Sequence, residues 1–173
     1  MRFLSKSVLA MALVAAMVGV GCGSSSRAAR GPGGAPIVLD VVLDRSPGQL
    51  PNGEQVEQLA GWMEPNLHQN LNSWGYQVVP QGNPQAYQPA PGRYLLILKI
   101  TRYNPGSKAA RMFVGLGAGA ATLDAHYTLF GPRGPVNEGD VSVGSGRDWQ
   151  FCANRANQQT VERITAVLRN LPA

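Results

Sequence analysis

A glycine-rich segment is the place in this sequence where a phosphate group would most plausibly be bound. Residues 107–123 read SKAARMFVGLGAGAATL and include Gly115, Gly117 and Gly119. A dinucleotide-binding loop needs the spacing G-x-G-x-x-G followed by a helix, because the helix N-terminus faces the pyrophosphate. Here the spacing is G-x-G-x-G, the following residues alternate in polarity as a strand does, and no Gly-Lys-Ser/Thr follows. The segment is therefore not predicted to bind a nucleotide.

Two interpretations of these glycines remain. The first is mechanical, because Gly117 and Gly119 permit backbone angles that a connection between two long strands needs. The second takes Gly115, Gly119 and their small neighbours as a close-packing surface for another chain or a membrane. Lys108 and Arg111 precede this surface and would supply positive charge. The predicted binding residues are thus these two cations and the three glycines.

Side chains that ligate metals or act as nucleophiles are few. The only histidines are His68, expected on a helix surface, and His126, and no cysteine pair accompanies them. His126 shares a predicted strand face with Asp124, where a solvated or hydrogen-bonded pair is more common than a metal site. VGSGR at 143–147 falls short of the G-x-S-x-G motif of serine hydrolases. The sequence predicts no metal, no cofactor and no enzymatic activity.

Separated carboxylates could still form an acid–base pair. The candidates are Asp40, Asp44, Glu138 and Asp140. Separated acidic residues are usually solvated, and we expect the same of these four.

The N-terminus has the pattern of an exported lipoprotein. Arg2 and Lys6 flank the start of an apolar run of about 13 residues, shorter than the roughly 20 that cross a membrane as a helix. The run ends at GVGC (19–22), which resembles the box where bacterial lipoproteins are cleaved before an acylated cysteine. We predict a signal peptide at 1–21, lipidation of Cys22 and a flexible tether at 22–35. Ordinary secretion with an incidental Cys22 is the alternative.

A lipid anchor would place the domain in the bacterial cell envelope. Gly23, rather than aspartate, follows the cysteine, which resembles lipoproteins sorted to the outer membrane and facing the periplasm. Loss of the leader lowers the formal net charge from +5 to +3. Acylation of Cys22 leaves Cys152 without an intrachain disulfide partner. Nucleic acid is not an expected partner in this compartment.

A basic stretch gives a second candidate for binding. Residues 93–111 carry five Lys or Arg side chains and no acidic residue. Such a cluster attracts anions such as lipid headgroups or glycans, and Tyr94, Tyr103 and Tyr127 would supply aromatic contacts. The alternative is that the cations are ordinary solvated charges on strands.

The remaining pattern predicts one α+β domain at 36–173. Apolar runs and alternation predict strands at 35–44, 76–79, 93–103, 122–130 and 135–146. An apolar stripe predicts a helix from the N-cap Asn52 to a left-handed cap at Gly75, and a second stripe predicts a helix at 151–171. Because Pro65 lies inside the first helix, we expect a kink near it or two shorter helices.

The element order predicts a two-layer sandwich. One strand, one helix, four strands and one helix favour a mixed, largely antiparallel sheet of about five strands with both helices on one face. The strand at 93–103 is apolar on both faces at its start, which favours a central position. The glycines of 135–146 favour a sheet edge.

One stretch is similar to a known family. NPGSKAARMFVGLGAGAATLDAHYTL (104–129) resembles bacterial lipoproteins grouped as domain-of-unknown-function family 4410, which carry a Gly-Ser-(Arg/Lys)-Ala-x-Arg segment, a glycine-alanine run and a strand. The resemblance extends over most of residues 36–170. It implies an envelope lipoprotein of unknown activity, with no catalytic residues to transfer.

Together these observations predict a lipid-anchored, non-enzymatic envelope protein. Its domain would bind another envelope protein or assemble with itself through residues 107–121. The alternative is a membrane-tethered module that binds an anionic glycan or lipid through the basic stretch.

Overall fold

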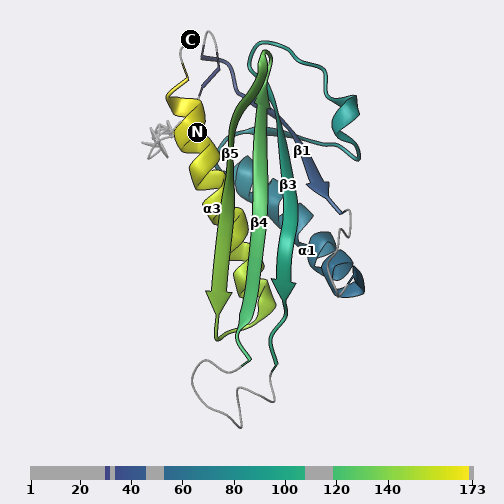
Figure 1. The fold of residues 1–173 in the computed structure, drawn as a ribbon. Coiled ribbons are helices and arrows are strands. Elements are labelled where there is room, and N and C mark those ends of the chain that lie inside the picture. Colours follow the sequence, from purple (N-terminus) through teal and green to yellow (C-terminus); the bar gives the residue numbers. More distant parts are fainter. Residues whose placement is uncertain (1–29, 32–33, 46–52, 108–118, 172–173) are drawn as a thin grey trace, which may run out of the picture.

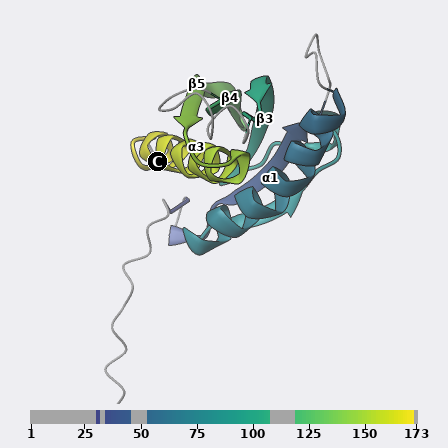
Figure 2. The same ribbon diagram turned by 90° about the horizontal axis from the view of Figure 1, so that it is seen from below.

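Two long helices cover one face of a five-stranded sheet (Figures 1 and 2). The computed structural model describes residues 30–31, 34–45, 53–107 and 119–171. In chain order the elements are β1 (Val38–Asp44), α1 (Gly53–Ser73), β2 (Gln77–Pro80), the 3-10 helix η2 (Pro84–Ala86), β3 (Arg93–Asn104), β4 (Ala121–Gly131), β5 (Gly134–Ser145) and α3 (Trp149–Arg169). The predicted signal peptide, Cys22, most of the tether and Asn52 lie outside the described residues.

The sheet has the order β2-β1-β3-β4-β5. β1 runs parallel to both β2 and β3, whereas β3, β4 and β5 form an antiparallel meander. The antiparallel strands pair over longer stretches than the parallel strands do. The predicted fold class and element order are confirmed, β3 is the central strand and β5 is an edge strand.

The helix-facing side of the sheet is the hydrophobic core. β4 alternates strictly between buried and half-buried residues, and its buried set packs under the helices. The buried stripe of α1 is the predicted one and comprises Val56, Leu59, Ala60, Met63, Leu67 and Leu71. Removing such side chains from water supplies most of the stabilisation of a domain of this size.

The ends and interior of α1 follow simple backbone rules. Gly75 has φ +92°, and Tyr76 N–H donates to Leu71 O while Gly75 N–H donates to Asn72 O. This is the double hydrogen bond of a left-handed helix cap, as predicted. The helix continues through Pro65, so the alternative of two shorter helices is wrong. Neither α1 nor any other helix within the described ranges is long and apolar enough to cross a membrane.

Buried polar side chains join α3 to the rest of the domain. Asn157, which is fully buried, donates to Met63 O at 3.0 Å and to Asn66 Oδ1 at 2.9 Å on α1. Tyr76 Oη donates to the buried Thr165 Oγ1 at 2.8 Å. Because an unpaired buried polar group is costly, these bonds favour one alignment of the two helices.

Two tryptophans also join the helices. Trp62 and Trp149 pack edge to face with ring centroids 5.9 Å apart and contact the core.

Glycines also allow the backbone after β3 to pack closely against the backbone before β4, at the lower end of the sheet in Figure 1. Gly106 and Gly119 have φ +74° and +70°, and Ser107 N–H donates to Gly119 O at 3.0 Å. A Cβ on Gly106 would lie 2.4 Å from Gly119 O and 2.9 Å from Ala121 N. The mechanical role predicted for Gly119 is therefore confirmed, and Gly106 shares it.

We expect Gly106→Ala to lower the free energy of unfolding by more than about 2 kcal/mol, because it combines a left-handed backbone with a collision against main-chain atoms. Urea denaturation followed by circular dichroism measures this. Gly82→Ala is the matched control, since a Cβ there meets nothing within 4 Å, and it should change stability by less than about 0.5 kcal/mol. Equal effects of the two substitutions would contradict this account.

Candidate functional site

Asp40, in the middle of β1, is the one carboxylate of the described chain that is fully buried. Its exposed fraction is 0%, and it lies on the sheet face opposite the helices. Arg93 on β3 donates from Nε to Asp40 Oδ2 at 2.5 Å and from Nη2 to Oδ1 at 2.7 Å. Gln81, which follows β2, donates to Oδ1 at 2.7 Å. The expectation that Asp40 is solvated is wrong, because the loop that begins at Gln81 covers this part of the face.

This cluster of Asp40, Arg93 and Gln81 is electrostatically matched. The hydrogen bonds from Arg93 lower the pKa of Asp40 against the opposing effect of burial, and they raise the pKa of Arg93. Both groups therefore stay charged at neutral pH. The cluster joins β1, β3 and the loop after β2, so it sets where residues 81–84 lie.

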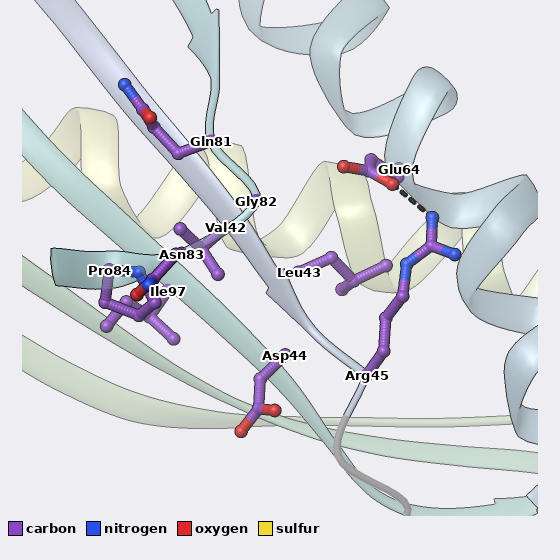
Figure 3. A pocket seen from close by; sticks show the side chains of 10 residues that line it. All are labelled: Val42, Leu43, Asp44, Arg45, Glu64, Gln81, Gly82, Asn83, Pro84 and Ile97. Atoms are coloured by element: carbon purple, nitrogen blue, oxygen red, sulfur yellow. Dashed lines mark hydrogen bonds and ion pairs between the residues drawn. The ribbon is translucent and has the colours of Figure 1, made fainter. Parts of the chain in front are cut away.

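Beside this loop lies a pocket of roughly 770 Å³ (Figure 3). β2 ends at Pro80 opposite Val41, whereas β1 continues to Asp44 beside β3. The end of β1 consequently has no strand of the described chain on its β2 side, and the pocket occupies that position. Its described lining is Val42, Leu43, Asp44, Arg45, Glu64, Gln81, Gly82, Asn83, Pro84 and Ile97.

The charged groups of the pocket neutralise one another. Arg45 donates to Glu64 Oε2 at 2.5 Å, as Figure 3 shows, and to Glu57 Oε1 at 2.6 Å. These carboxylates raise the pKa of Arg45. Asp44 lies 3.7 Å from Lys99 Nζ. The described lining contains no histidine, cysteine or hydroxyl side chain, and its ionisable groups are Asp44, Arg45 and Glu64.

The basic stretch of β3 is balanced by acids on neighbouring strands. Arg93 pairs with Asp40 and Lys99 with Asp44, as above, and Arg102 Nε lies 2.7 Å from Asp124 Oδ2. The register places Lys99 opposite Asp44 and Arg102 opposite Asp124, whereas Arg93 lies opposite Val38 and reaches Asp40 diagonally. The three described cations are thus not an unbalanced positive surface, and Lys108 and Arg111 lie outside the described residues.

The tyrosines predicted to contact a glycan lie on the sheet face that the helices cover. Tyr103 and Tyr127 are 8% and 4% exposed and Tyr94 packs against the core, all on the helix side. Burial raises the pKa of Tyr103 to about 12. The prediction that these rings form a binding surface is wrong, because the bulge between Ile100 and Arg102 and the strand alternation turn them inward.

The two histidines do not converge. His126 Nδ1 lies 2.8 Å from Asp140 Oδ1 on β5, not beside Asp124, which instead accepts from Ser142 and pairs with Arg102. His68 is half-buried rather than on the surface, and burial lowers its pKa. No three potential metal ligands cluster within the described ranges.

Of the predicted binding residues, the structure describes one. Gly119 lies where the chain re-enters the sheet, next to Gly106 and Ser107. Lys108, Arg111, Gly115 and Gly117 lie outside the described residues. The pocket was not predicted. The Asp40 cluster, which shares Gln81 with the pocket, did carry a signal, since a carboxylate between Leu39 and Val41 in a largely apolar strand needs a partner.

The model of a domain of unknown function, DUF4410, matches residues 40–162. The chain belongs to this family. The matched region contains every strand of the sheet in whole or in part and most of α3. No curated protein matches the sequence significantly.

Several solved structures of bacterial proteins are similar in part. The PelC dodecamer from Paraburkholderia phytofirmans is 9% identical, with 75% of this chain and 87% of that chain covered and a TM-score of 0.46. Lipoprotein GNA1162 from Neisseria meningitidis is 16% identical over 76% and 99%, with a TM-score of 0.42. A minor lipoprotein from Acinetobacter baumannii is 12% identical over 75% and 92%, with a TM-score of 0.36.

We expect Asp40→Ala to lower the free energy of unfolding by about 3 kcal/mol, because Arg93 and Gln81 lose their shared acceptor. Asp140→Ala removes a carboxylate that is 82% exposed and should cost less than about 1 kcal/mol. Urea titrations of the two variants make the comparison. Similar losses in both would show that the Asp40 cluster is no more than a surface ion pair.

The Asp40 cluster should also make stability depend on pH. Because the folded pKa of Asp40 lies below its ordinary value of 3.8, its contribution is present above about pH 4 and is lost as the pH falls through the folded pKa. Thermal melts between pH 5 and pH 2 should therefore show a smaller decline for Asp40→Asn than for the unaltered protein. Parallel declines would contradict the assignment.

Proposed function

We propose that this protein is a lipid-anchored, non-enzymatic component of the bacterial cell envelope, and that its domain binds another envelope protein or a further copy of itself. The anchor is Cys22, and the outer membrane facing the periplasm is the proposed site. The observation that supports the proposal is the separation between the end of the sheet where β1 begins and the end where Ser107 and Gly119 lie, the two described residues that flank the predicted binding segment.

The two ends of the sheet can be defined by residues. The tether pole contains the start of β1, which bonds to Gly92, and the β4–β5 turn at Gly131–Gly134. The distal pole contains Gly106–Ser107, Gly119–Ala121 and the residues from Ser145 to Phe151, because Ala121 pairs with Ser145. In Figure 1 these are the upper and lower ends of the sheet.

The length of the sheet keeps these poles apart. β3 spans both with 12 residues, which at roughly 3.3 Å each amounts to about 40 Å. The chain between Cys22 and Arg30 reaches at most about 30 Å. A domain standing on its tether would thus present the distal pole to the periplasm, where a protein partner is reachable and the anchoring membrane is not.

The distal pole has a suitable contact group. Phe151, at the start of α3, is 39% exposed and is the exposed large hydrophobic side chain of the described chain. The Arg147 guanidinium lies 4.7 Å from the centre of its ring. An aromatic ring beside an arginine is a combination that is enriched at protein interfaces. Phe151 shares the distal pole with Ser107 and Gly119. The proposed contact residues Lys108, Arg111, Gly115 and Gly117 lie between these two in the sequence, and Gly119 is the fifth.

The distribution of charge and of reactive groups supports a binding role over the other two functions. Binding of an anionic glycan or lipid through β3 would need unbalanced cations and exposed rings, whereas Arg93, Lys99 and Arg102 pair with acids. Tyr103 and Tyr127 are buried and Tyr94 packs against the core. Enzymatic activity would need reactive groups that converge, and the pocket's acids are engaged by Arg45 and Lys99. We therefore assign no catalytic residue and no cofactor.

Site-specific photo-crosslinking in intact bacteria tests this function. A photoreactive phenylalanine analogue at position 151 should give a discrete protein adduct, whereas the same group at Arg133, exposed at the tether pole, should not. Adducts at Arg133 but not at position 151 would overturn the assignment of the distal pole.

The lipid anchor has its own test. Mass spectrometry of the mature N-terminus should find an acylated Cys22, and Cys22→Ser should release the protein from membranes.

A further inference from the structure

We propose that the outer edge of β5 pairs with the same edge of a second copy of this chain, antiparallel and about a two-fold axis at Val141. This surface differs from the distal pole, so the inference goes beyond the proposed function and does not rest on it. β5 is the last strand of the sheet, and in the described chain no further strand follows it.

The backbone of β5 offers a row of hydrogen-bonding groups to such a strand. Arg163 on α3 donates from Nη1 to Asp140 O at 2.5 Å, which identifies this carbonyl as pointing away from β4. Because residues of an edge strand alternate between pairing inward and pointing outward, Glu138, Ser142 and Gly144 point outward with Asp140. All four are exposed. None of these four residues makes a backbone–backbone hydrogen bond outside the sheet within the described ranges.

The two edges of the sheet differ in their protection. Edge strands are usually protected by short length, by proline or by charge. β2 has 4 residues and ends in Pro80. β5 has 12 residues, and its proline, Pro135, lies next to the hairpin turn rather than in the middle. Glu138 and Asp140 supply charge to the first half of β5, so the stretch with neither charge nor proline is Val141 to Ser145.

Side-chain chemistry selects one register for two copies. With Val141 on the axis, Asp140 of each copy lies opposite Ser142 of the other, and Glu138 lies opposite Gly144. A carboxylate and Ser142 already pair in this sheet, where Ser142 Oγ donates to Asp124 Oδ1 at 2.6 Å. An axis at Asp140 would instead place two carboxylates face to face, which is unfavourable. The register at Val141 buries no like charges against each other.

Arg163 competes with this pairing. In the paired state the Ser142 N–H of the second copy would donate to Asp140 O, and Arg163 would have to leave that carbonyl. The arginine therefore satisfies the edge of a single copy and weakens association without preventing it. Its removal should favour the paired state.

Gly144 provides a matched pair of tests. A Cβ at this position has only Thr122 Cγ2 within 4 Å, at 3.9 Å, so both Gly144→Lys and Gly144→Glu should fold. Because the axis makes two equivalent contacts, a lysine at position 144 would attract Glu138 of the other copy at both, and a glutamate there would repel Glu138 at both. In sedimentation equilibrium of the mature, lipidated chain in detergent, the dimer dissociation constant should be about tenfold lower for the lysine variant than for the glutamate variant.

Two further variants test the edge itself. Arg163→Ala should tighten the dimer several-fold, whereas Arg155→Ala, an exposed position on the same helix, should not. Ser142→Pro removes an outward N–H and should abolish the dimer while leaving the circular dichroism spectrum unchanged. A monomer in every folded variant at all concentrations, or equal constants for the two Gly144 variants, would overturn the proposal. Crosslinking at position 151 would be unaffected, which separates this outcome from failure of the distal-pole function.

Discussion

The ion pair between Asp40 and Arg93 is the interaction on which the arrangement of the sheet most depends. A carboxylate with no exposed surface lies in the middle of β1 and is held by three hydrogen bonds from Arg93 and Gln81. Since an unpaired charge there would be very costly, the chain is stable only when β1, β3 and the loop after β2 meet at this point. The pocket beside β1 follows from that meeting, because the same loop forms one of its walls.

The open face of the sheet is polar but electrically balanced. Acids on β1, β4 and β5 face cations or histidine on the adjoining strands, as in the pairs of Lys99 with Asp44, Arg102 with Asp124 and His126 with Asp140. Each pair is partly exposed and contributes little to stability individually. Their collective effect is to remove the strong field that an isolated basic strand would have. Recognition at this domain is therefore expected to depend on shape and backbone groups more than on net charge.

Two surfaces remain for association, and the fold separates them. The distal pole is formed where β3 and β5 end and where β4 and α3 begin, and it carries the exposed Phe151. The β5 edge is the lateral edge of the sheet, whereas the distal pole is one end of its strands. Because the proposed pairing of β5 is antiparallel, two paired copies would carry their distal poles at opposite ends of the joined sheet, so neither pole is covered by the pairing.

The sequence by itself determined the elements and the layer arrangement, because apolar periodicity and glycine or proline positions act locally. The stripe of α1, the alternation of β4 and the left-handed cap at Gly75 are all confirmed. It also predicted the family and a mechanical role for Gly119, whereas the predicted lipidation of Cys22 and the roles of Lys108, Arg111, Gly115 and Gly117 remain predictions.

Only the tertiary structure decided which charges pair and which rings are buried. Asp40 and Arg93 are 53 residues apart in the chain, and His126 meets Asp140 rather than Asp124 because strand pairing, not sequence proximity, sets their distance. The bulge in β3 and the loop over β1 likewise turned a basic, tyrosine-containing stretch into a neutral surface with buried rings. Such outcomes depend on register and on long-range contacts, which no single segment of the sequence contains.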